Sequence, residues 1–142
     1  MSLEVFSDRT RGWFTGAFAG PTPAQEQAWP AIASGEHVLI SAPTGSGKTL
    51  AAFLYGIDQL ASEPVTASRK DRRIRLVYVS PLKALSYDVD RNLRTPLRGI
   101  GASELTVAVR TGDTPQRERA QMLRSAPDIL ITTPEPRCAP AT

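Results

Sequence analysis

The chain has 142 residues, of which 41% are hydrophobic and 22% charged, and it carries a formal net charge of +3. This balance is typical of a globular protein with one core and excludes wholesale disorder. The mild positive charge fits a partner that carries phosphates, although many other proteins share it. Cys138 is the single cysteine, which excludes an internal disulfide and a cysteine-based metal site.

The N-terminus has no basic segment followed by an apolar core, so it does not resemble a secretory signal. No apolar run approaches the roughly 20 residues needed to span a bilayer. We therefore expect a cytoplasmic protein without a membrane partner.

Two helices are predicted before the first strand. Residues 7–19 form the first, and the Gly20-Pro21 pair ends it. Thr22 is a typical N-cap for the second helix, which should extend to Ser34. Pro30 lies inside this second helix and allows a kink or an early stop.

From residue 37 onward, short apolar runs alternate with helical segments. Strands are predicted at residues 37–41, 74–80, 105–110 and 128–132. Helices are predicted at residues 48–61, 83–97 and 115–125, with a polar connection at 62–71. The alternation predicts an α/β fold with a parallel sheet flanked by helices on both faces. In such a sheet the functional residues follow the carboxyl ends of the strands.

The strongest motif, Ala42-Pro43-Thr44-Gly45-Ser46-Gly47-Lys48-Thr49, follows the first of these strands and opens a helix. Gly45 and Gly47 let the backbone turn its N–H groups toward an anion, and the helix N-terminus adds donors and partial positive charge. Lys48 would supply a cation for the β and γ phosphates, and Thr49 a hydroxyl for magnesium. A glycine-rich turn with a chance lysine is the less favoured alternative.

Pro21-Thr22-Pro23-Ala24-Gln25 followed by this loop resembles the Q motif and motif I of superfamily 2 helicases of the DEAD/DEAH-box type, in which alanine is usual at position 42. Pro81-Leu82-Lys83-Ala84-Leu85, Arg110-Thr111-Gly112-Asp113-Thr114 and Thr132-Thr133-Pro134-Glu135 are similar to the motifs of the Lhr (large helicase-related) type. The resemblance covers about residues 14–135. It implies part of a RecA-like P-loop domain within residues 1–135, and a tail foreign to the family at 136–142.

The resemblance also implies a role for each matching residue. Gln25 would hydrogen-bond adenine and so select ATP, since an amide donates and accepts at once. The residues that bind ATP and Mg²⁺ would be Gln25, Thr44, Gly45, Ser46, Gly47, Lys48 and Thr49, with Lys48 catalytic and Thr49 the metal ligand. The backbone of DNA or of an RNA–DNA hybrid would be contacted by Pro81, Lys83, Thr111, Gly112, Thr133 and Pro134.

Three parts that such a helicase needs have no counterpart in the sequence. It contains no Asp-Glu pair for a Walker B motif, no Ser-Ala-Thr motif and no second RecA-like domain. We therefore expect a domain truncated before the Walker B strand, which binds ATP but neither hydrolyses it nor unwinds nucleic acid. The prolines of residues 136–142 lead to the hypothesis of a disrupted gene. Uncovered apolar sheet edges would make the product marginally stable and prone to aggregation.

Other functions stay open. The chain could be a non-catalytic module that binds nucleotide or nucleic acid, or a remnant without function. An unrelated P-loop kinase or GTPase leaves Gln25 and the motifs at Pro81 and Thr133 unexplained. The solvent-exposed face of the helix at 115–125 is interpreted as formed by Arg117, Glu118, Arg119 and Arg124. The preference for DNA or RNA and the oligomeric state are not predicted.

Overall fold

The computed structural model describes residues 2–63, 73–81, 83–102 and 104–134. The chain divides into two compact units. The first comprises Met1–Pro64 and Thr95–Ser103, and the second comprises Val65–Arg94 and Glu104–Thr142. The predicted connection at 62–71 and the tail at 136–142 fall largely or wholly outside the described residues.

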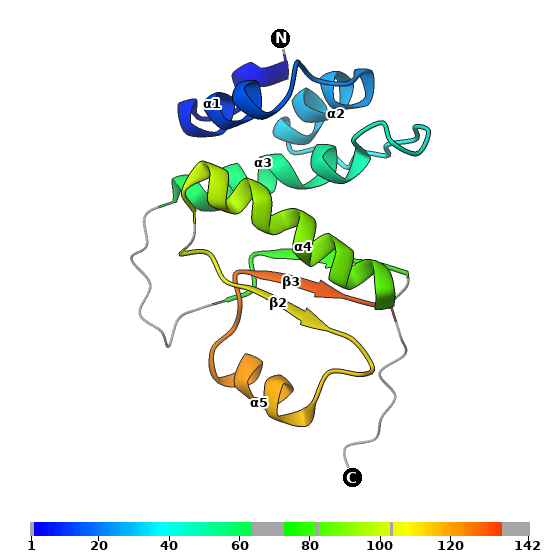
Figure 1. Ribbon diagram of the computed structural model, residues 1–142, viewed down its shortest axis with the longest axis vertical. Coiled ribbons are helices and arrows are strands. Elements are labelled where there is room, and N and C mark those ends of the chain that lie inside the picture. Colours follow the sequence, from blue (N-terminus) through cyan, green and yellow to red (C-terminus); the bar gives the residue numbers. More distant parts are fainter. Residues whose placement is uncertain (1, 64–72, 82, 103, 135–142) are drawn as a thin grey trace. The chain divides into compact units, whose positions relative to one another are not determined.

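The first unit is helical (Figure 1). It contains the 3-10 helix η1 (Ser2–Val5), α1 (Asp8–Ala17), α2 (Pro23–Ala33), α3 (Lys48–Ser62) and the end of α4 (Lys83–Ile100). Thr22 is confirmed as the N-cap of α2, because its side chain accepts from the Gln25 N–H. α2 continues through Pro30 to Ala33, so the helix does not stop early.

Aromatic side chains form the core of the first unit. Trp29 is fully buried, and its ring meets Phe6 edge-on at a centroid distance of 4.9 Å and Phe14 at 5.4 Å. Leu54 and Ile57 of α3 are also fully buried. Removing rings and branched side chains of this size from water is the main stabilising contribution to such a helical unit.

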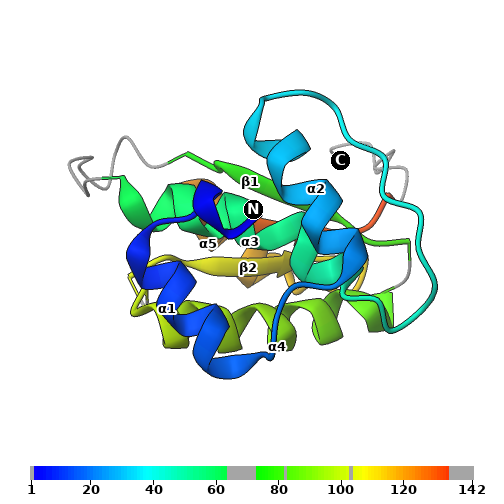
Figure 2. The same cartoon turned by 90° about the horizontal axis from the view of Figure 1, so that it is seen from above.

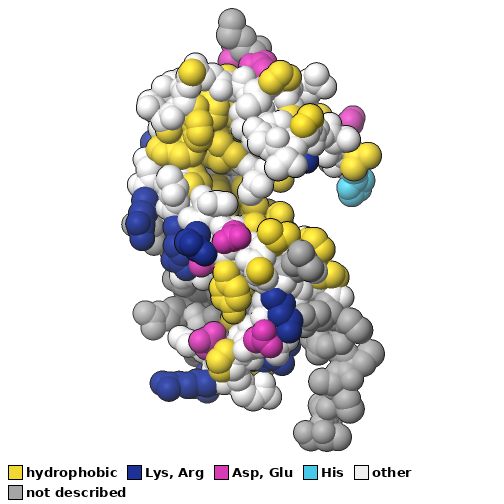
Figure 3. Space-filling model, turned by 45° about the vertical axis from the view of Figure 1, so that its right-hand side comes forward, with side chains coloured by type: hydrophobic (Ala, Val, Ile, Leu, Met, Phe, Trp, Pro, Cys, Tyr) yellow, Lys and Arg dark blue, Asp and Glu magenta, His cyan; other side chains and the backbone are white. Residues whose placement is uncertain are grey.

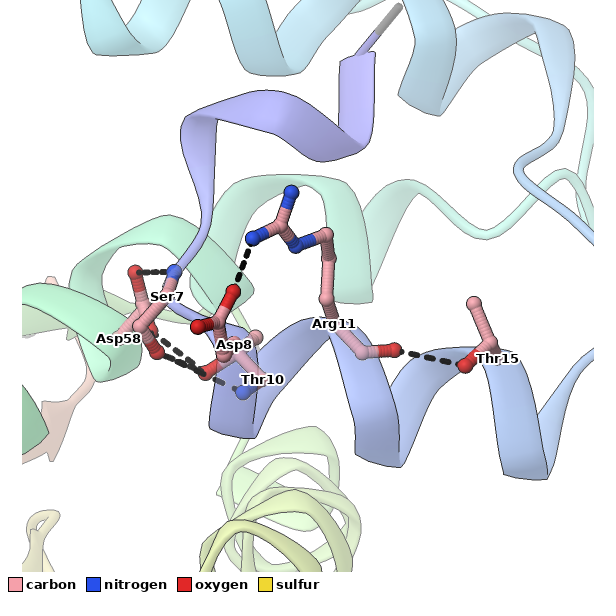
Figure 4. Close-up of polar contacts among 6 residues, drawn as sticks. All are labelled: Ser7, Asp8, Thr10, Arg11, Thr15 and Asp58. Atoms are coloured by element: carbon pink, nitrogen blue, oxygen red, sulfur yellow. Dashed lines mark hydrogen bonds and ion pairs between the residues drawn. The ribbon is translucent and has the colours of Figure 1, made fainter.

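A buried carboxylate joins α3 to the start of α1 (Figure 4). Asp58 is 2% exposed. It accepts hydrogen bonds from the Ser7 N–H at 3.1 Å, the Ser7 hydroxyl at 2.5 Å and the Thr10 hydroxyl at 2.6 Å. A negative charge at a helix N-terminus is favourable because the unpaired N–H groups there carry partial positive charge. Asp58 therefore fixes α1 on α3, the helix that begins at the phosphate loop.

The second unit contains a parallel sheet. Its strands are β1 (Leu76–Val79), β2 (Val107–Arg110) and β3 (Ile129–Thr132), in the order β1-β3-β2. Ile129 and Ile131 of the middle strand are fully buried. Figure 1 shows α4 and α5 (Gln116–Arg124) on opposite sides of the sheet. The predicted α/β class with parallel strands and flanking helices is confirmed.

The strand register aligns the residues that follow the three strands. Val79 of β1 and Arg110 of β2 both pair with Thr132 of β3. The next residues along each strand therefore form one row, which consists of Ser80, Thr111 and Thr133. The Ser80 N–H donates to the Thr132 carbonyl at 2.8 Å, and the Thr132 hydroxyl donates to the Arg110 carbonyl at 2.7 Å.

One predicted strand is wrong. Residues 37–41 form an irregular loop between α2 and α3 (Figure 2), in which Leu39 is 93% exposed. A strand exists only where a neighbouring strand accepts and donates its backbone hydrogen bonds. Within the described residues, no backbone hydrogen bond links this run to any strand. An apolar run alone was therefore insufficient evidence for a strand.

Candidate functional site

The predicted phosphate loop makes a tight turn in front of α3. Gly45 and Gly47 have φ angles of 84° and 75°, in the left-handed region that favours glycine. The Ser46 N–H donates to the Pro43 carbonyl at 3.2 Å and closes the turn. Gly47 is the N-cap of α3, and no side chain in the described ranges caps this helix. The N–H groups of its first turn are therefore available to an anion.

Lys48 is the first residue of α3 and lies over the loop. Its Nζ donates to the Ala42 carbonyl at 2.5 Å, while Thr44 and Thr49 are exposed. The loop thus presents N–H groups, an ammonium and hydroxyls. Nowhere in the described part of the chain do three or more His, Cys, Asp or Glu side chains cluster to hold a metal. This donor set fits a triphosphate that brings its own Mg²⁺, with the Thr49 hydroxyl as a further ligand.

Two residues at the start of α2 are bound to the same loop. The Gln25 Nε2 donates to the Gly47 carbonyl at 3.2 Å, and the Thr22 hydroxyl donates to the Ser46 carbonyl at 2.7 Å. The Gln25 Oε1 also accepts from the Thr22 N–H at 3.0 Å, which completes a capping box. Gln25 is only 4% exposed. Helix α2 and the phosphate loop are therefore held as one piece.

Sequence reasoning assigned Gln25 to adenine alone and missed this structural role. The signal was present, since Thr-x-x-Gln at a helix start is the capping-box pattern. A primary amide has two N–H donors and two acceptor positions, so the contacts with Thr22 and Gly47 leave one of each. The contact between Gln25 and adenine stays a prediction.

The second group of predicted residues lies at the carboxyl edge of the sheet, where β1, β2 and β3 end. The group consists of Pro81, Lys83, Thr111, Gly112, Thr133 and Pro134. The Lys83 Nζ lies 3.2 Å from the Asp113 Oδ1, which joins the segment after β1 to the turn after β2. The structure brings these six residues to one edge of one unit, as their positions after successive strands predicted.

Hydrogen bonds define the turn after β2. The Thr111 N–H donates to the Thr114 hydroxyl at 2.8 Å, and the Asp113 N–H donates to the Thr111 hydroxyl at 3.2 Å. Arg119 of α5 donates from Nη2 to the carbonyls of Thr111 at 3.0 Å and Gly112 at 3.1 Å. The interpretation of Arg119 as a solvent-exposed side chain is therefore wrong. Its contacts depend on how α5 folds back on the turn, and no local sequence signal shows them.

The phosphate loop and Gln25 belong to the first unit, whereas the carboxyl edge belongs to the second. The predicted parallel sheet implies that Lys48 lies beside the ends of β1 and β3, but this position relates the two units and stays a prediction. No helix in the described ranges combines the length and the apolar character needed to cross a membrane.

Comparison with known proteins places the chain in a family. Residues 22–138 match the model of the DEAD/DEAH box helicases. Over 94% of its length the chain is 55% identical to the Lhr helicase/probable uracil glycosylase of Mycolicibacterium smegmatis. Over 93% it is 51% identical to the Lhr helicase/uracil glycosylase of Escherichia coli. It spans only 9% of the length of each of these two relatives.

Solved structures of helicases match the fold of this chain. The Mycobacterium smegmatis helicase Lhr, bound to ssDNA and AMP-PNP, has a TM-score of 0.84 and 54% identity over 94% of this chain and 17% of that one. The RNA helicase Prp28 from Chaetomium thermophilum, bound to ADP, has a TM-score of 0.72 and 25% identity over 91% of this chain and 30% of that one. The fold is thus part of a RecA-like α/β domain, and the chain belongs to the Lhr type of the DEAD/DEAH box helicases.

Proposed function

We propose that the chain is the ATP-binding portion of an Lhr-type helicase. It binds ATP with Mg²⁺ through the phosphate loop, and it binds a nucleic-acid backbone through the carboxyl edge of the sheet. The observation that carries this proposal is the hydrogen bond from Gln25 to the Gly47 carbonyl. Through it, the side chain expected to contact adenine also holds the loop expected to bind the phosphates. The Mycobacterium smegmatis relative, bound to ssDNA and AMP-PNP, supports both ligands.

In this proposal each residue of the loop has a separate task. The Lys48 ammonium exchanges the Ala42 carbonyl for oxygens of the β and γ phosphates, which is favourable because hydrogen bonds between charged groups are the stronger kind. The backbone N–H groups of Gly45 and Gly47 contact the phosphates, and the Thr49 hydroxyl contacts Mg²⁺. Bound ATP supplies the phosphoryl group whose transfer drives movement along nucleic acid in the full-length helicase.

At the carboxyl edge we propose contacts that hold phosphates without reading bases. Lys83 offers a cation, Thr111 and Thr133 offer hydroxyls, and Gly112 offers a backbone N–H. Pro81 and Pro134 shape the segments that follow β1 and β3. The ligand is a strand of DNA or of an RNA–DNA hybrid, and the contacts are to its backbone.

We further propose that the 142-residue chain alone binds ATP without hydrolysing it. The sequence contains no Asp-Glu pair. Phosphoryl transfer depends almost wholly on positioning and on charge stabilisation by Mg²⁺ and acidic or basic side chains. Binding therefore does not lead to turnover in this chain by itself.

Calorimetric titration with ATP and with GTP in the presence of Mg²⁺ tests these proposals. We expect ATP to bind more tightly than GTP. Lys48→Ala should weaken ATP binding at least about tenfold, because a charge-assisted hydrogen bond contributes about 1.5–3 kcal/mol. Arg91→Ala, which removes an exposed cation from α4, should leave ATP binding unchanged.

Phosphate release separates the remaining alternatives. We expect none from the wild-type chain with Mg²⁺ and ATP. Mg²⁺-dependent release that Lys48→Ala abolishes would show a competent enzyme. A folded chain whose melting temperature responds neither to ATP nor to oligonucleotide would be a remnant without function.

A further inference from the structure

Arg119 of α5 is hydrogen-bonded to the turn that follows β2. Its Nη2 donates to the carbonyls of Thr111 and Gly112, at 3.0 and 3.1 Å. Its Nε is buried and has no hydrogen-bond partner in the described part of the chain. The guanidinium is planar and always charged. The two carbonyls that it holds belong to consecutive peptide groups, so both peptide planes of the turn are constrained.

These peptide planes decide where the N–H groups of the turn point. The Thr111 carbonyl and the Gly112 N–H belong to one trans peptide, so they point in opposite directions. Because Arg119 holds the carbonyl, the N–H points away from the guanidinium. A carbonyl that accepts from a cation is also polarised, which strengthens the N–H of the same peptide as a donor.

The Gly112 N–H is left open to an outside acceptor. The N–H groups of Thr111, Asp113 and Thr114 already have acceptors within the turn. The Gly112 N–H has no acceptor among the described residues, and Gly112 is exposed. A single unpaired N–H in an exposed turn suits a phosphate oxygen, because most protein–DNA hydrogen bonds go to phosphate and sugar.

We propose that Arg119 is a positioning residue that directs the Gly112 N–H toward a nucleic-acid phosphate without contacting the nucleic acid. The inference rests on the proposed function, in which this turn binds the backbone. It adds Arg119 of α5 to the residues on which nucleic-acid binding depends. The positive charge of Arg119 then acts on the carbonyls of the turn and not on the nucleic acid.

Fluorescence anisotropy with a labelled oligodeoxythymidine, repeated at several salt concentrations, tests the proposal on the whole chain. The variants are Arg119→Gln and Arg119→Lys. Arg117→Gln is the matched control, because it removes the same charge from an exposed position of the same helix. Relative to this control, Arg119→Gln should weaken binding about three- to tenfold, the usual effect of losing one hydrogen bond. Arg119→Lys keeps the charge but not the planar guanidinium, and it should lose most of the same affinity.

The salt dependence separates positioning from direct contact. A cation on a phosphate releases a counterion, whereas a neutral N–H releases none. Arg119→Gln should therefore show the same slope of log affinity against log salt as Arg117→Gln. In ¹H–¹⁵N spectra the Gly112 signal should shift when oligonucleotide is added to the wild type and stay in place in Arg119→Gln. The melting temperatures of the variants verify that they are folded.

Three results would overturn the inference. One is a slope of log affinity against log salt that is less steep by about 0.7 for Arg119→Gln than for the control. Such a slope would make Arg119 itself a phosphate ligand. The second is that Arg119→Gln and Arg117→Gln bind the oligonucleotide with equal affinity. The third is that Arg119→Lys binds it as tightly as the wild type does. A wild-type chain that binds no oligonucleotide would overturn the nucleic-acid part of the proposed function as well, so the two failures are distinguishable.

Discussion

At Gly47 the backbone of the phosphate loop approaches the Gln25 side chain so closely that no methyl group fits between them. A Cβ on Gly47 would lie 2.4 Å from the Gln25 Nε2. Gly45 has a similar φ of 84°, but nothing lies within 4 Å of its Cβ position. The two glycines therefore separate the effect of backbone conformation from the effect of crowding.

We expect Gly47→Ala to destabilise the chain more than Gly45→Ala. Both alanines must adopt a left-handed backbone, which costs about 1–2 kcal/mol. Gly47→Ala also displaces Gln25 from the Gly47 carbonyl, which costs about 1 kcal/mol more. Chemical denaturation without nucleotide measures both losses. Equal losses would show that the contact between Gln25 and Gly47 contributes nothing to stability.

Individual residues could be predicted where the chemistry is local. The two glycines and Lys48 follow from the need to surround an anion, and the structure gives the glycines the required φ angles. The second role of Gln25 and the contacts of Arg119 were missed. The contact from Gln25 to Gly47 spans 22 residues, and the contacts of Arg119 depend on how α5 folds back on the turn after β2.

At the scale of elements, helices were predicted better than strands, for a physical reason. A helix satisfies most of its hydrogen bonds within itself, so caps such as Thr22 and the end of a glycine-rich loop locate its start. A strand depends on a neighbour. Three predicted strands have one in the sheet, and the run at residues 37–41 has none among the described residues. α4 extends past Pro96 to Ile100, although the prediction ended it at residue 97.

The docking of α1 on α3 should depend on Asp58. Asp58→Asn keeps the size of the side chain but removes the charge that three donors of Ser7 and Thr10 share. We expect a loss of about 1.5–3 kcal/mol of unfolding free energy, the usual range for hydrogen bonds to a charged group. Hydrogen exchange should quicken in α1 more than in the β-sheet.

Asp8→Asn is the control for this prediction. Asp8 lies on the same helix as Thr10, but its side chain is 96% exposed. Its substitution should leave the exchange rates nearly unchanged. If Asp58→Asn and Asp8→Asn behave alike, the carboxylate of Asp58 does not hold α1.

At the scale of the whole molecule, hydrophobic side chains remain open to solvent. Yellow side chains gather on the face shown in Figure 3. On the strand β1, Val77 and Val79 are each 54% exposed. β1 is also an edge of the three-stranded sheet. An edge strand with exposed valines offers both backbone hydrogen bonds and apolar surface to another chain.

We expect the chain to self-associate, and the double substitution Val77→Thr with Val79→Thr to reduce this. Threonine keeps the β-branched shape that suits a strand, so the melting temperature should change little. Sedimentation velocity over a range of concentrations measures the association. Leu123→Gln, which removes an 88% exposed side chain from α5, should have a smaller effect. A wild-type chain that stays monomeric at every concentration would refute the expectation.

The shared register of the three strands limits how this chain can vary. Ser80, Thr111 and Thr133 stand in one row because Val79 and Arg110 both pair with Thr132. Side chains alternate between the two faces of a strand, so inserting or deleting one residue within β3 would turn Thr133 to the opposite face. Such a change would also shift it out of line with both neighbours. The length of the middle strand is therefore constrained by both of its neighbours at once.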